Sequence, residues 1–469
     1  MFYRGLLAQA LLEELSSLLG KEALAFDPQV RTLYGNDWSN SADSIPCAVV
    51  FPETVKAVQE VVRWAQKHAV SLVPSGGRTG YSGGAVASEG QLVVSLDKLN
   101  GISDFDPINN TVRCGAGVVT AQLQAFATDK DRLYPVAFAS SGSSQIGGNI
   151  ATNAGGIRVI RYGMTRDWVA GLRVVSATGE LLDLNRGLVK NNAGYDLRHL
   201  FVGSEGTLGI IVEATMRLCS RPPASAVLLL GASSLVSILS ILRSFKDRLR
   251  LLAFEFFSAS GLERVVASLG LPNPLNQSCE FYALVEVECP SQEEKAKLEN
   301  CIEKCTEAGW LVDGVLAHSE VQARKLWRYR EEISATIAPQ KPLKHDISTT
   351  VSRMPELLDE LQKLVDDAGA DLTTVWFGHI GDGNIHLNLL APDSMSPDEF
   401  AQHCRGLSQA VFSAVQKHGG SVSAEHGVGL LKKPYLHYSH GPGELHIMKA
   451  IKRSLDPMGI MNPGKILDV

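Results

Sequence analysis

Hydrophobic and polar positions follow two different periods along this chain, and the period predicts which segments are helices and which are strands. Residues 54–69 carry apolar side chains three and four positions apart, which is typical of one face of a helix. Short apolar runs bounded by turn-forming residues predict strands at 46–53, 71–75, 91–96, 111–117, 168–184 and 206–218. The first half of the chain is therefore expected to mix helices with strands.

A second pattern begins after Arg221-Pro222-Pro223, which interrupts the chain. Strand-like runs at 226–231, 253–258 and 282–288 alternate with charged helical segments at 293–309 and 320–338, and the chain after about residue 395 is helical. This order predicts an α+β region with antiparallel pairing. The most apolar stretch, 226–245, contains Gly231 and five serines. A strand followed by a serine-capped helix explains it better than a membrane span.

The N-terminal segment has apolar residues at helical spacing, but acidic residues interrupt it and no cleavage site follows. A cytoplasmic protein is therefore expected. The mitochondrial matrix would apply only to a eukaryotic chain, and no transit peptide is visible.

Composition narrows the classes of protein further. A length of 469 residues predicts roughly two to four domains, and 45% hydrophobic with 20% charged residues is ordinary for a folded chain. The formal net charge of −6 argues against a nucleic-acid partner, which usually requires basic residues to neutralise phosphates. The eight cysteines include no CxxC pair, and their spacing favours reduced, mostly buried thiols.

Two glycine-rich loops are the first candidates for ligand binding. Residues 74–84 directly follow a predicted strand, and a second tract covers 140–149 and continues to Gly156. Glycine lets several backbone N–H groups point at one anion, although a tight connection between strands is an alternative for either loop alone. Two such loops predict one extended ligand that contacts both. The segment 115–120 has two of the three glycines of a nicotinamide fingerprint and lacks its acidic residue, which disfavours a Rossmann site.

The motifs PSGGRTGYSGGA, SSGSSQIGGNIATNAGG, RYG (161–163) and GSEGTLGII (203–211) resemble the FAD-binding domain of the vanillyl-alcohol oxidase flavoprotein family, also called PCMH-type. The resemblance implies that the first loop holds the pyrophosphate, the second passes the isoalloxazine and the third meets the adenosine half. Neither loop contains histidine or cysteine, so non-covalent FAD is expected. The residues that this resemblance assigns to FAD are Pro74, Ser75, Gly76, Gly77, Arg78, Thr79, Gly80, Ser82, Ser141, Gly142, Ser143, Gly147, Gly148, Asn149, Thr152, Asn153, Gly155, Glu205, Gly206, Ile210, Ile211 and Asn462.

Nine of the twelve histidines follow residue 344, which directs attention to the C-terminal third. After a Gly-Asp-Gly turn, strict alternation places Asn384, His386 and Asn388 on one face of a predicted strand. His379, His386 and Glu425 are a candidate N,N,O set for a divalent metal, because three protein ligands leave a position open for substrate. Histidines bonded to backbone in a core are the alternative, and the spacing alone does not decide between them.

GHIGDGNIHLN and SAEHGVG are similar to the D-2-hydroxyglutarate dehydrogenase and D-lactate dehydrogenase branch of that family. The resemblance implies that His379, His386 and Glu425 hold Zn2+ and that His426 is the catalytic base. It also implies that Asn388 helps to bind the C1 carboxylate of the substrate.

The charged helix 320–338 and the following strand hold three further candidates. Arg330 and Ser334 are four residues apart, and Lys344 lies in the strand 343–348. A solvated helix face is the alternative for Arg330. The same branch binds the distal carboxylate of its substrate with an Arg, a Ser or Thr and a Lys in this order, although the interval from Arg to Lys is here one residue shorter than in some relatives. By this resemblance the three side chains form a carboxylate clamp.

These observations predict a zinc-dependent FAD dehydrogenase that oxidises D-2-hydroxyglutarate to 2-oxoglutarate, with hydride transfer to flavin N5 and proton removal by His426. Electrons would leave through a carrier such as electron-transfer flavoprotein. Dehydrogenases of D-lactate or D-malate, and a non-enzymatic flavin- or metal-binding subunit, are the alternatives. The expected fold is α+β. A PCMH-type FAD-binding domain of two α/β subdomains covers 1–221 (core from about 42), a substrate domain with an antiparallel sheet covers 222–400, and a helical segment that returns to the flavin covers 401–469. The oligomeric state stays open, with a homodimer among the alternatives.

Overall fold

The computed structural model describes residues 2–39, 45–369 and 371–469, with no side-chain description for residues 2–9. The expected start of the FAD-binding core near residue 42 lies outside these residues. The chain forms two compact units. Unit 1 comprises Met1–Gly155, Met164–Arg221 and Glu425–Val469, and unit 2 comprises Gly156–Gly163 and Pro222–Ala424.

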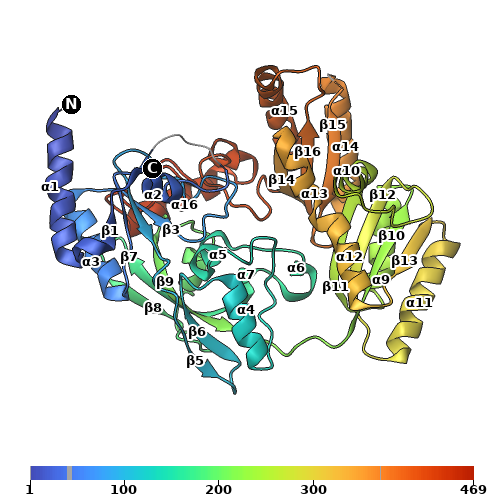
Figure 1. Cartoon of the computed structure of the whole chain (residues 1–469), viewed down its shortest axis with the longest axis horizontal. Helices are drawn as coiled ribbons and strands as arrows, with labels where there is room; N and C mark the ends of the chain where they lie inside the picture. Colours follow the sequence, from blue (N-terminus) through green and yellow to red (C-terminus); the bar gives the residue numbers. More distant parts are fainter. Residues whose placement is uncertain (1, 40–44, 370) are drawn as a thin grey trace. The chain divides into compact units, whose positions relative to one another are not determined.

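Unit 1 contains a four-stranded sheet of order β1-β2-β4-β3, of which β1 and β3 are labelled in Figure 1. Its strands β2, β4 and β3 are parallel, and β1 pairs antiparallel with β2. The strands are β1 Leu24–Ala25, β2 Ala48–Val50, β3 Leu72–Ser75 and β4 Leu92–Ser95, and the helices beside them are α1 Phe2–Leu19, η1 Lys21–Ala23, α2 Pro28–Tyr34 and α3 Val55–His68. The predicted helix 54–69 is confirmed as α3, which begins where the Thr54 side chain accepts the backbone N–H of Ala57.

The second sheet of unit 1 is wholly antiparallel and has the order β5-β6-β9-β7-β8. Its strands are β5 Ile102–Asp106, β6 Thr111–Gly115, β7 Val169–Ser176, β8 Leu181–Leu184 and β9 Gly209–Arg217. The remaining helices of the unit are α4 Thr120–Asp129, α5 Ile146–Thr152, α7 Thr165–Trp168, α8 Arg198–Phe201, η5 Lys433–Tyr438 and α16 Pro442–Leu455. The C-terminal end of the chain rejoins this unit, because the backbone N–H of Leu72 donates to Ile460 and that of Asn462 donates to Leu72.

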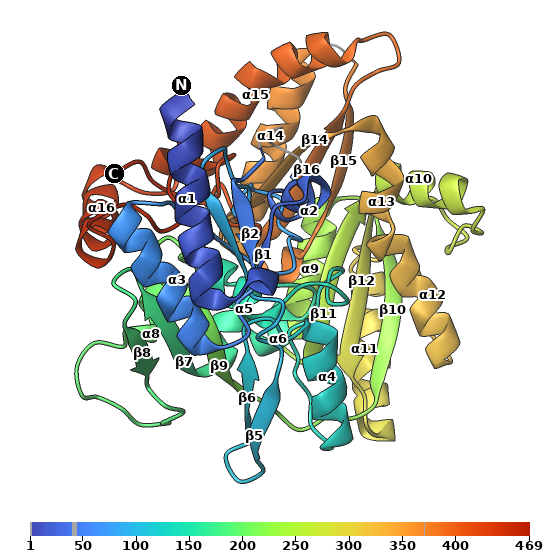
Figure 2. The same ribbon diagram turned by 60° about the vertical axis from the view of Figure 1, so that its left-hand side comes forward.

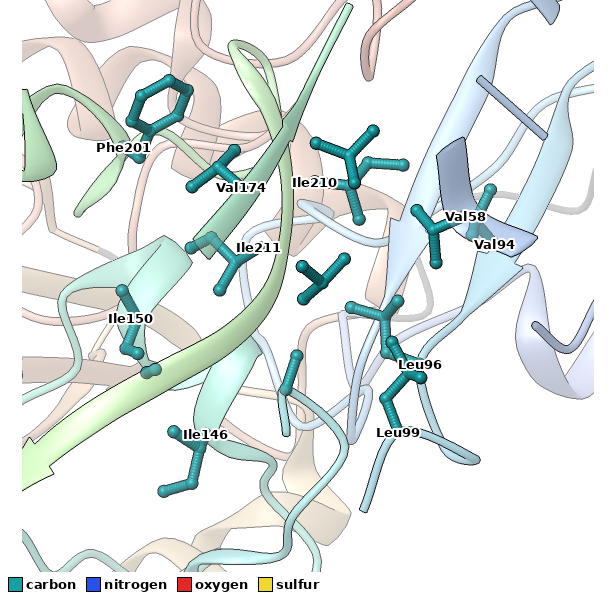
Figure 3. Close-up of a cluster of buried hydrophobic side chains, with 14 of the residues drawn as sticks. Val58, Val94, Leu96, Leu99, Ile146, Ile150, Val174, Phe201, Ile210 and Ile211 are labelled. Atoms are coloured by element: carbon teal, nitrogen blue, oxygen red, sulfur yellow. The ribbon is translucent and has the colours of Figure 1, made fainter. Parts of the chain in front are cut away.

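One apolar core joins the two sheets of unit 1. Figure 3 shows Val58 of α3 and Val94 of β4 facing the side chains of β9, with α5 on the other side of that strand. Burial of these side chains is the main force that holds the two sheets together, because apolar surface removed from water contributes about 25 cal/mol per Å².

Unit 2 is built on a seven-stranded sheet of order β13-β10-β12-β11-β15-β16-β14, in which all neighbours are antiparallel. All of its strands except β13 are labelled in Figure 2. Its strands are β10 Ser225–Ala232, β11 Leu251–Ser258, β12 Phe281–Glu288, β13 Asp313–Leu316, β14 Leu343–Ser348, β15 Thr373–Gly378 and β16 Asn384–Leu390. Its helices are α6 Val159–Tyr162, α9 Leu235–Lys246, α10 Ala259–Leu269, α11 Gln292–Glu307, α12 Glu320–Glu331, α13 Ile333–Ile337, η2 Ala338–Gln340, η3 Val351–Arg353, α14 Met354–Ala368, η4 Ile380–Asp382 and α15 Pro397–Lys417. The α+β, antiparallel expectation for this region is confirmed.

Helices cover both faces of this sheet. On one face, Leu326 and Tyr329 of α12 share a core with Phe257 of β11 and Phe377 of β15. The other face meets α14 and α15: the Trp376 indole donates to Gln362 of α14 at 3.1 Å, and His345 lies 3.2 Å from Ser408 of α15. A strand buried on both faces explains why all seven residues of β16 are buried, polar ones included.

The structure differs from the expected boundaries in two places. Residues 401–424 belong to unit 2, because α15 packs on α14 and on β14. The segment 320–338 forms two helices, α12 and α13, with Glu332 between them, and the Glu332 backbone (φ −81°, ψ −7°) stays in the right-handed helical region. The expected strand and serine-capped helix within 226–245 are confirmed as β10 and α9, with the Ser234 side chain as cap. In the part of the chain that the structure describes, no helix is both long and apolar enough to cross a bilayer. All eight cysteines are free thiols.

Candidate functional site

The two glycine loops of unit 1 lie against each other. The first follows β3, and the second leads into α5. A Cβ at Gly77 would collide with Ser143 O and would lie 2.8 Å from Ser144 Cα, so only glycine allows this approach. The expectation that both loops face one ligand is thus supported by their direct contact.

Polar atoms without partners mark the same place. Ser75 Oγ at the end of β3, Gln145 Oε1 in the second loop and Asn462 Oδ1 beside β3 are buried and accept or donate no hydrogen bond among the described residues. Buried polar atoms are usually satisfied, so three orphans around one pair of loops indicate a polar ligand. At Gly142 and Gly148, a Cβ would meet nothing within 4 Å, which leaves room beside the backbone. These features fit a large polar cofactor such as FAD.

Several side chains expected at the flavin instead bind the protein itself. The Thr152 hydroxyl donates to Gly148 O at 3.0 Å, Asn153 Oδ1 accepts the N–H of Arg166 at 2.9 Å, and Ser141 donates to Phe138 O at 2.7 Å. These three therefore shape the second loop.

Ile210 and Ile211 are placed differently from the expectation. Their side chains lie in the core of unit 1 (Figure 3), 0% and 5% exposed, and their backbones pair with Val175 and Val174 of β7. Apolar side chains of a central strand point into the core, and both isoleucines pack there.

Glu205 and Ser82, two further residues expected at the flavin, bind the segment that carries His426. The Glu205 carboxylate accepts the backbone N–H groups of Val428 and Gly429 at 2.7 and 2.8 Å. Burial raises the pKa of Glu205, and the two N–H donors oppose that shift. The Ser82 hydroxyl lies 3.0 and 2.9 Å from the carbonyls of His426 and Gly427.

His426 itself lies within unit 1, its ring 5.2 Å from that of Tyr81. Its side chain is 28% exposed, and Nε2 is 3.6 Å from a carboxylate oxygen of the preceding Glu425. Because its backbone is fixed by Ser82 and the next residues by Glu205, the imidazole is held by the flavin-binding unit itself. This is the support that a general base requires.

His379 and His386 come together at the β15–β16 hairpin. Phe377 pairs with His386, and the turn between the strands brings the His379 ring to 5.5 Å from the His386 ring, nearly perpendicular at 84°. Gly378 allows the sharp return, because a Cβ there would lie 2.7 Å from Asn384 O. Both imidazoles are buried.

Glu425 completes the metal-binding candidates. The chain leaves unit 2 at Ala424, whose N–H donates to Asp346 O at 3.3 Å, and Asp346 pairs with His386 across β14 and β16. Glu425 is the next residue. The two paired imidazoles of unit 2 and the carboxylate of the residue that follows this unit in the chain are donor types that fit a divalent ion such as zinc.

Glu255 is the residue that the sequence reasoning missed. It lies in β11 with 1% of its side chain exposed, 2.6 Å from His379 Nδ1 and 2.8 Å from Arg330 Nη2. The β11–β15 register explains the first contact, since Phe256 pairs with Gly378 and each of these residues is next in the chain to Glu255 or His379. A single carboxylate inside the apolar run LLAFEFFS was the available signal.

Arg330 is not on a solvated helix face. It is 7% exposed, its guanidinium lies 4.8 Å above the Phe377 ring, and its buried Nε has no hydrogen-bond partner among the described residues. An unsatisfied buried cationic donor favours an anionic ligand. Ser334 follows Glu332 in α13 and is exposed, whereas Arg330 is buried, so a clamp that uses both side chains stays a prediction.

Lys344 and Asn388 lie on the sheet face that Arg330 covers. They are directly opposite each other in β14 and β16, and Asn388 is also opposite Val375 of β15, two residues before Phe377. The Asn388 amide makes only long contacts of 3.4 Å with backbone carbonyls. The predicted alternation of β16 is thereby confirmed, with His386 and Asn388 on one face.

Comparison with known proteins assigns both the first and the second part of the chain to a family. Residues 46–185 match the family described as FAD binding domain, and residues 221–466 match FAD linked oxidases, C-terminal domain. The chain is 52% identical to D-2-hydroxyglutarate dehydrogenase of Stutzerimonas stutzeri (strain A1501), over 97% of this chain and 98% of that protein. It is 48% identical to D-2-hydroxyglutarate dehydrogenase of Xanthomonas citri pv. viticola, over 93% of this chain and 92% of that protein.

Among solved structures, p-cresol methylhydroxylase with bound substrate has the same fold, with a TM-score of 0.75, 17% identity, and coverage of 98% of this chain and 97% of that one. The PCMH-type fold expected from the glycine loops is confirmed. The matched domains and the full-length relatives lead to one conclusion: the chain belongs to the family of FAD-linked oxidases and is an FAD-dependent oxidoreductase.

Proposed function

We propose that the protein oxidises D-2-hydroxyglutarate to 2-oxoglutarate as a zinc-dependent FAD dehydrogenase. The two bacterial relatives described above carry the name of this activity. A dicarboxylic substrate is favoured because the guanidinium of Arg330 is buried and its Nε has no hydrogen-bond partner among the described residues. D-Lactate has no second carboxylate for such a group, whereas D-2-hydroxyglutarate has one.

The chain's own residues divide the work by chemistry. His379, His386 and Glu425 would hold the zinc ion, and Arg330 with Lys344 would bind the distal carboxylate. Asn388, whose amide has only long protein contacts, would bind the C1 carboxylate. His426 would take the hydroxyl proton. When bound, zinc would act as a Lewis acid and lower the pKa of the substrate hydroxyl.

The glycine loops and Asn462 would hold FAD without a covalent bond. When bound, FAD supplies the acceptor for the hydride that leaves C2. The loops contain no histidine or cysteine, so acid precipitation should release all the FAD into the supernatant. The electrons would then pass to a carrier such as electron-transfer flavoprotein.

Steady-state reduction of an artificial electron-accepting dye tests the proposal. The FAD-loaded, zinc-loaded protein is assayed with D-2-hydroxyglutarate, D-malate and D-lactate at the same ionic strength. The expected order of kcat/KM places D-2-hydroxyglutarate first. A higher value for D-lactate would transfer the proposal to that substrate, and no dye reduction with any of the three would refute the proposed substrate class.

A further inference from the structure

Glu255 has an environment that packing does not explain. Its neighbours in β11, Phe254 and Phe256, are buried, and so is its cross-strand partner Leu284. Burial of a carboxylate costs several kcal/mol unless both oxygens are paired. Oε1 makes a hydrogen bond with His379 Nδ1 at 2.6 Å, whereas Oε2 is 2.8 Å from Arg330 Nη2, an ion pair that lacks hydrogen-bond geometry. One carboxylate therefore contacts a candidate zinc ligand and the candidate substrate-binding cation.

The adjacent strand offers a comparison. Glu286 of β12 is also buried, and it lies 3.0 Å from Arg158, whose side chain is 29% exposed. That pair keeps one partner in contact with water, as buried acids of a sheet commonly do. Arg330 and His379, by contrast, are only 8% and 9% exposed. Both partners of Glu255 are thus buried with it, away from water.

We propose that Glu255 is a positioning residue that orients the zinc ligand His379 and the substrate-binding Arg330 together. This inference rests on the proposed function. A carboxylate at Nδ1 holds the proton on that nitrogen, so the lone pair of the ring lies on Nε2, the nitrogen left for the metal. The same carboxylate fixes the guanidinium beside Phe377, and it couples metal binding to recognition of the distal carboxylate.

His386 shows that the arrangement at His379 is particular. Its Nδ1 lies 3.6 Å from a carboxylate oxygen of Asp346, against 2.6 Å between His379 Nδ1 and Glu255. The Glu255 contact is the shorter of these two. It is also the one that continues to Arg330.

Two substitutions separate the two parts of this role. Glu255→Gln leaves one acceptor oxygen for two donors, and the His379 N–H will occupy it whenever the metal is bound. Arg330 then faces an amide N–H group instead of a carboxylate. Glu255→Ala removes both acceptors. Glu286→Ala is the matched control, because it removes a buried, ion-paired glutamate from the next strand of the same sheet.

The experiment measures zinc retention and substrate preference in these variants of the FAD-loaded protein. Zinc affinity is determined by competition with a chromophoric chelator, and kcat/KM is measured for D-2-hydroxyglutarate and D-lactate. Glu255→Ala should lower zinc affinity about 10- to 100-fold, the range for losing an outer-shell partner. Glu255→Gln should hold zinc within about threefold of the wild type and should lower the ratio of D-2-hydroxyglutarate to D-lactate kcat/KM at least tenfold. Glu286→Ala should change neither quantity.

Two results would overturn the proposal: wild-type zinc affinity in Glu255→Ala, or an unchanged substrate ratio in Glu255→Gln. If Glu255→Ala fails to fold, the substrate ratio of Glu255→Gln still decides the role at Arg330. If the wild type binds zinc but oxidises neither acid, the proposed function fails. The zinc competition then still tests Glu255, so the two failures are distinguishable.

Discussion

Replacement of Arg330 by methionine separates substrate recognition from general stability. Methionine keeps an unbranched apolar side chain, although a shorter one, and can pack on the Phe377 ring, over which the guanidinium lies at 4.8 Å. It removes the cation that we assign to the distal carboxylate. Because D-lactate lacks that carboxylate, the substitution should discriminate between the two acids.

The magnitude follows from the partners of Arg330. Truncation of one member of a buried charged pair costs about 2–5 kcal/mol of binding. Glu255 lies 2.8 Å from Nη2 and partly neutralises the guanidinium charge, so we expect a loss in the lower half of this energy range. A loss of about 2–3 kcal/mol in transition-state binding corresponds to about 30- to 160-fold in kcat/KM for D-2-hydroxyglutarate. The loss for D-lactate should be less than about fivefold.

The assay is steady-state dye reduction with both acids, together with urea unfolding to measure stability. Glu255 keeps His379 as a partner in Arg330→Met, but the broken ion pair should still lower the free energy of unfolding. Arg328→Met is the control, because Arg328 lies on the same helix and is exposed. Equal losses for both acids would refute the reasoning, since they would mean that Arg330 is structural or binds the C1 carboxylate. D-Lactate would then become the better candidate substrate.

Three further predictions concern the metal ligands, the His426 segment and a buried lysine. Removal of zinc with a chelator should abolish turnover and leave the flavin absorption spectrum unchanged. His386→Ala should weaken zinc binding by more than the roughly 100-fold loss expected for an outer-shell partner. Full activity in a verified metal-free sample would mean that the histidines only pack in the core. Glu205→Ala leaves the N–H groups of Val428 and Gly429 without their acceptor, so the free energy of unfolding in urea should fall by about 1–3 kcal/mol for each. The kcat values for both acids should fall equally, and a selective loss for one acid would contradict this prediction. Burial lowers the pKa of Lys465 to about 8 from its ordinary 10.5, so between these values the unfolded chain binds more protons and the free energy of unfolding rises with pH. Lys465→Met should reduce that rise in urea unfolding at pH 8 and 10, and an unchanged slope would disprove the assignment.

Local patterns in the sequence were enough for most elements and for the residue types of the site. The helix at 54–69, the strand at 343–348 and the alternation of β16 all appear as predicted, because helix period and strand alternation are properties of a few consecutive residues. The glycine loops were recognisable for the same reason, because each motif consists of consecutive residues. His379 and His386 were identified within one hairpin, although spacing alone did not separate a metal site from a core.

Contacts between distant segments were decided only by the tertiary structure. Glu255 meets His379 across 124 residues of sequence, through a strand register that no local pattern encodes. Glu205 reaches Val428 across 223 residues, so a residue expected at the flavin turned out to hold the His426 segment. Ile210 and Ile211 belong to a motif of the flavin loops, yet the core takes their side chains. The sequence determined which chemical groups are available and on which local element each lies. The pairing of strands and the burial of apolar surface, which depend on the whole chain, decided which of those groups meet.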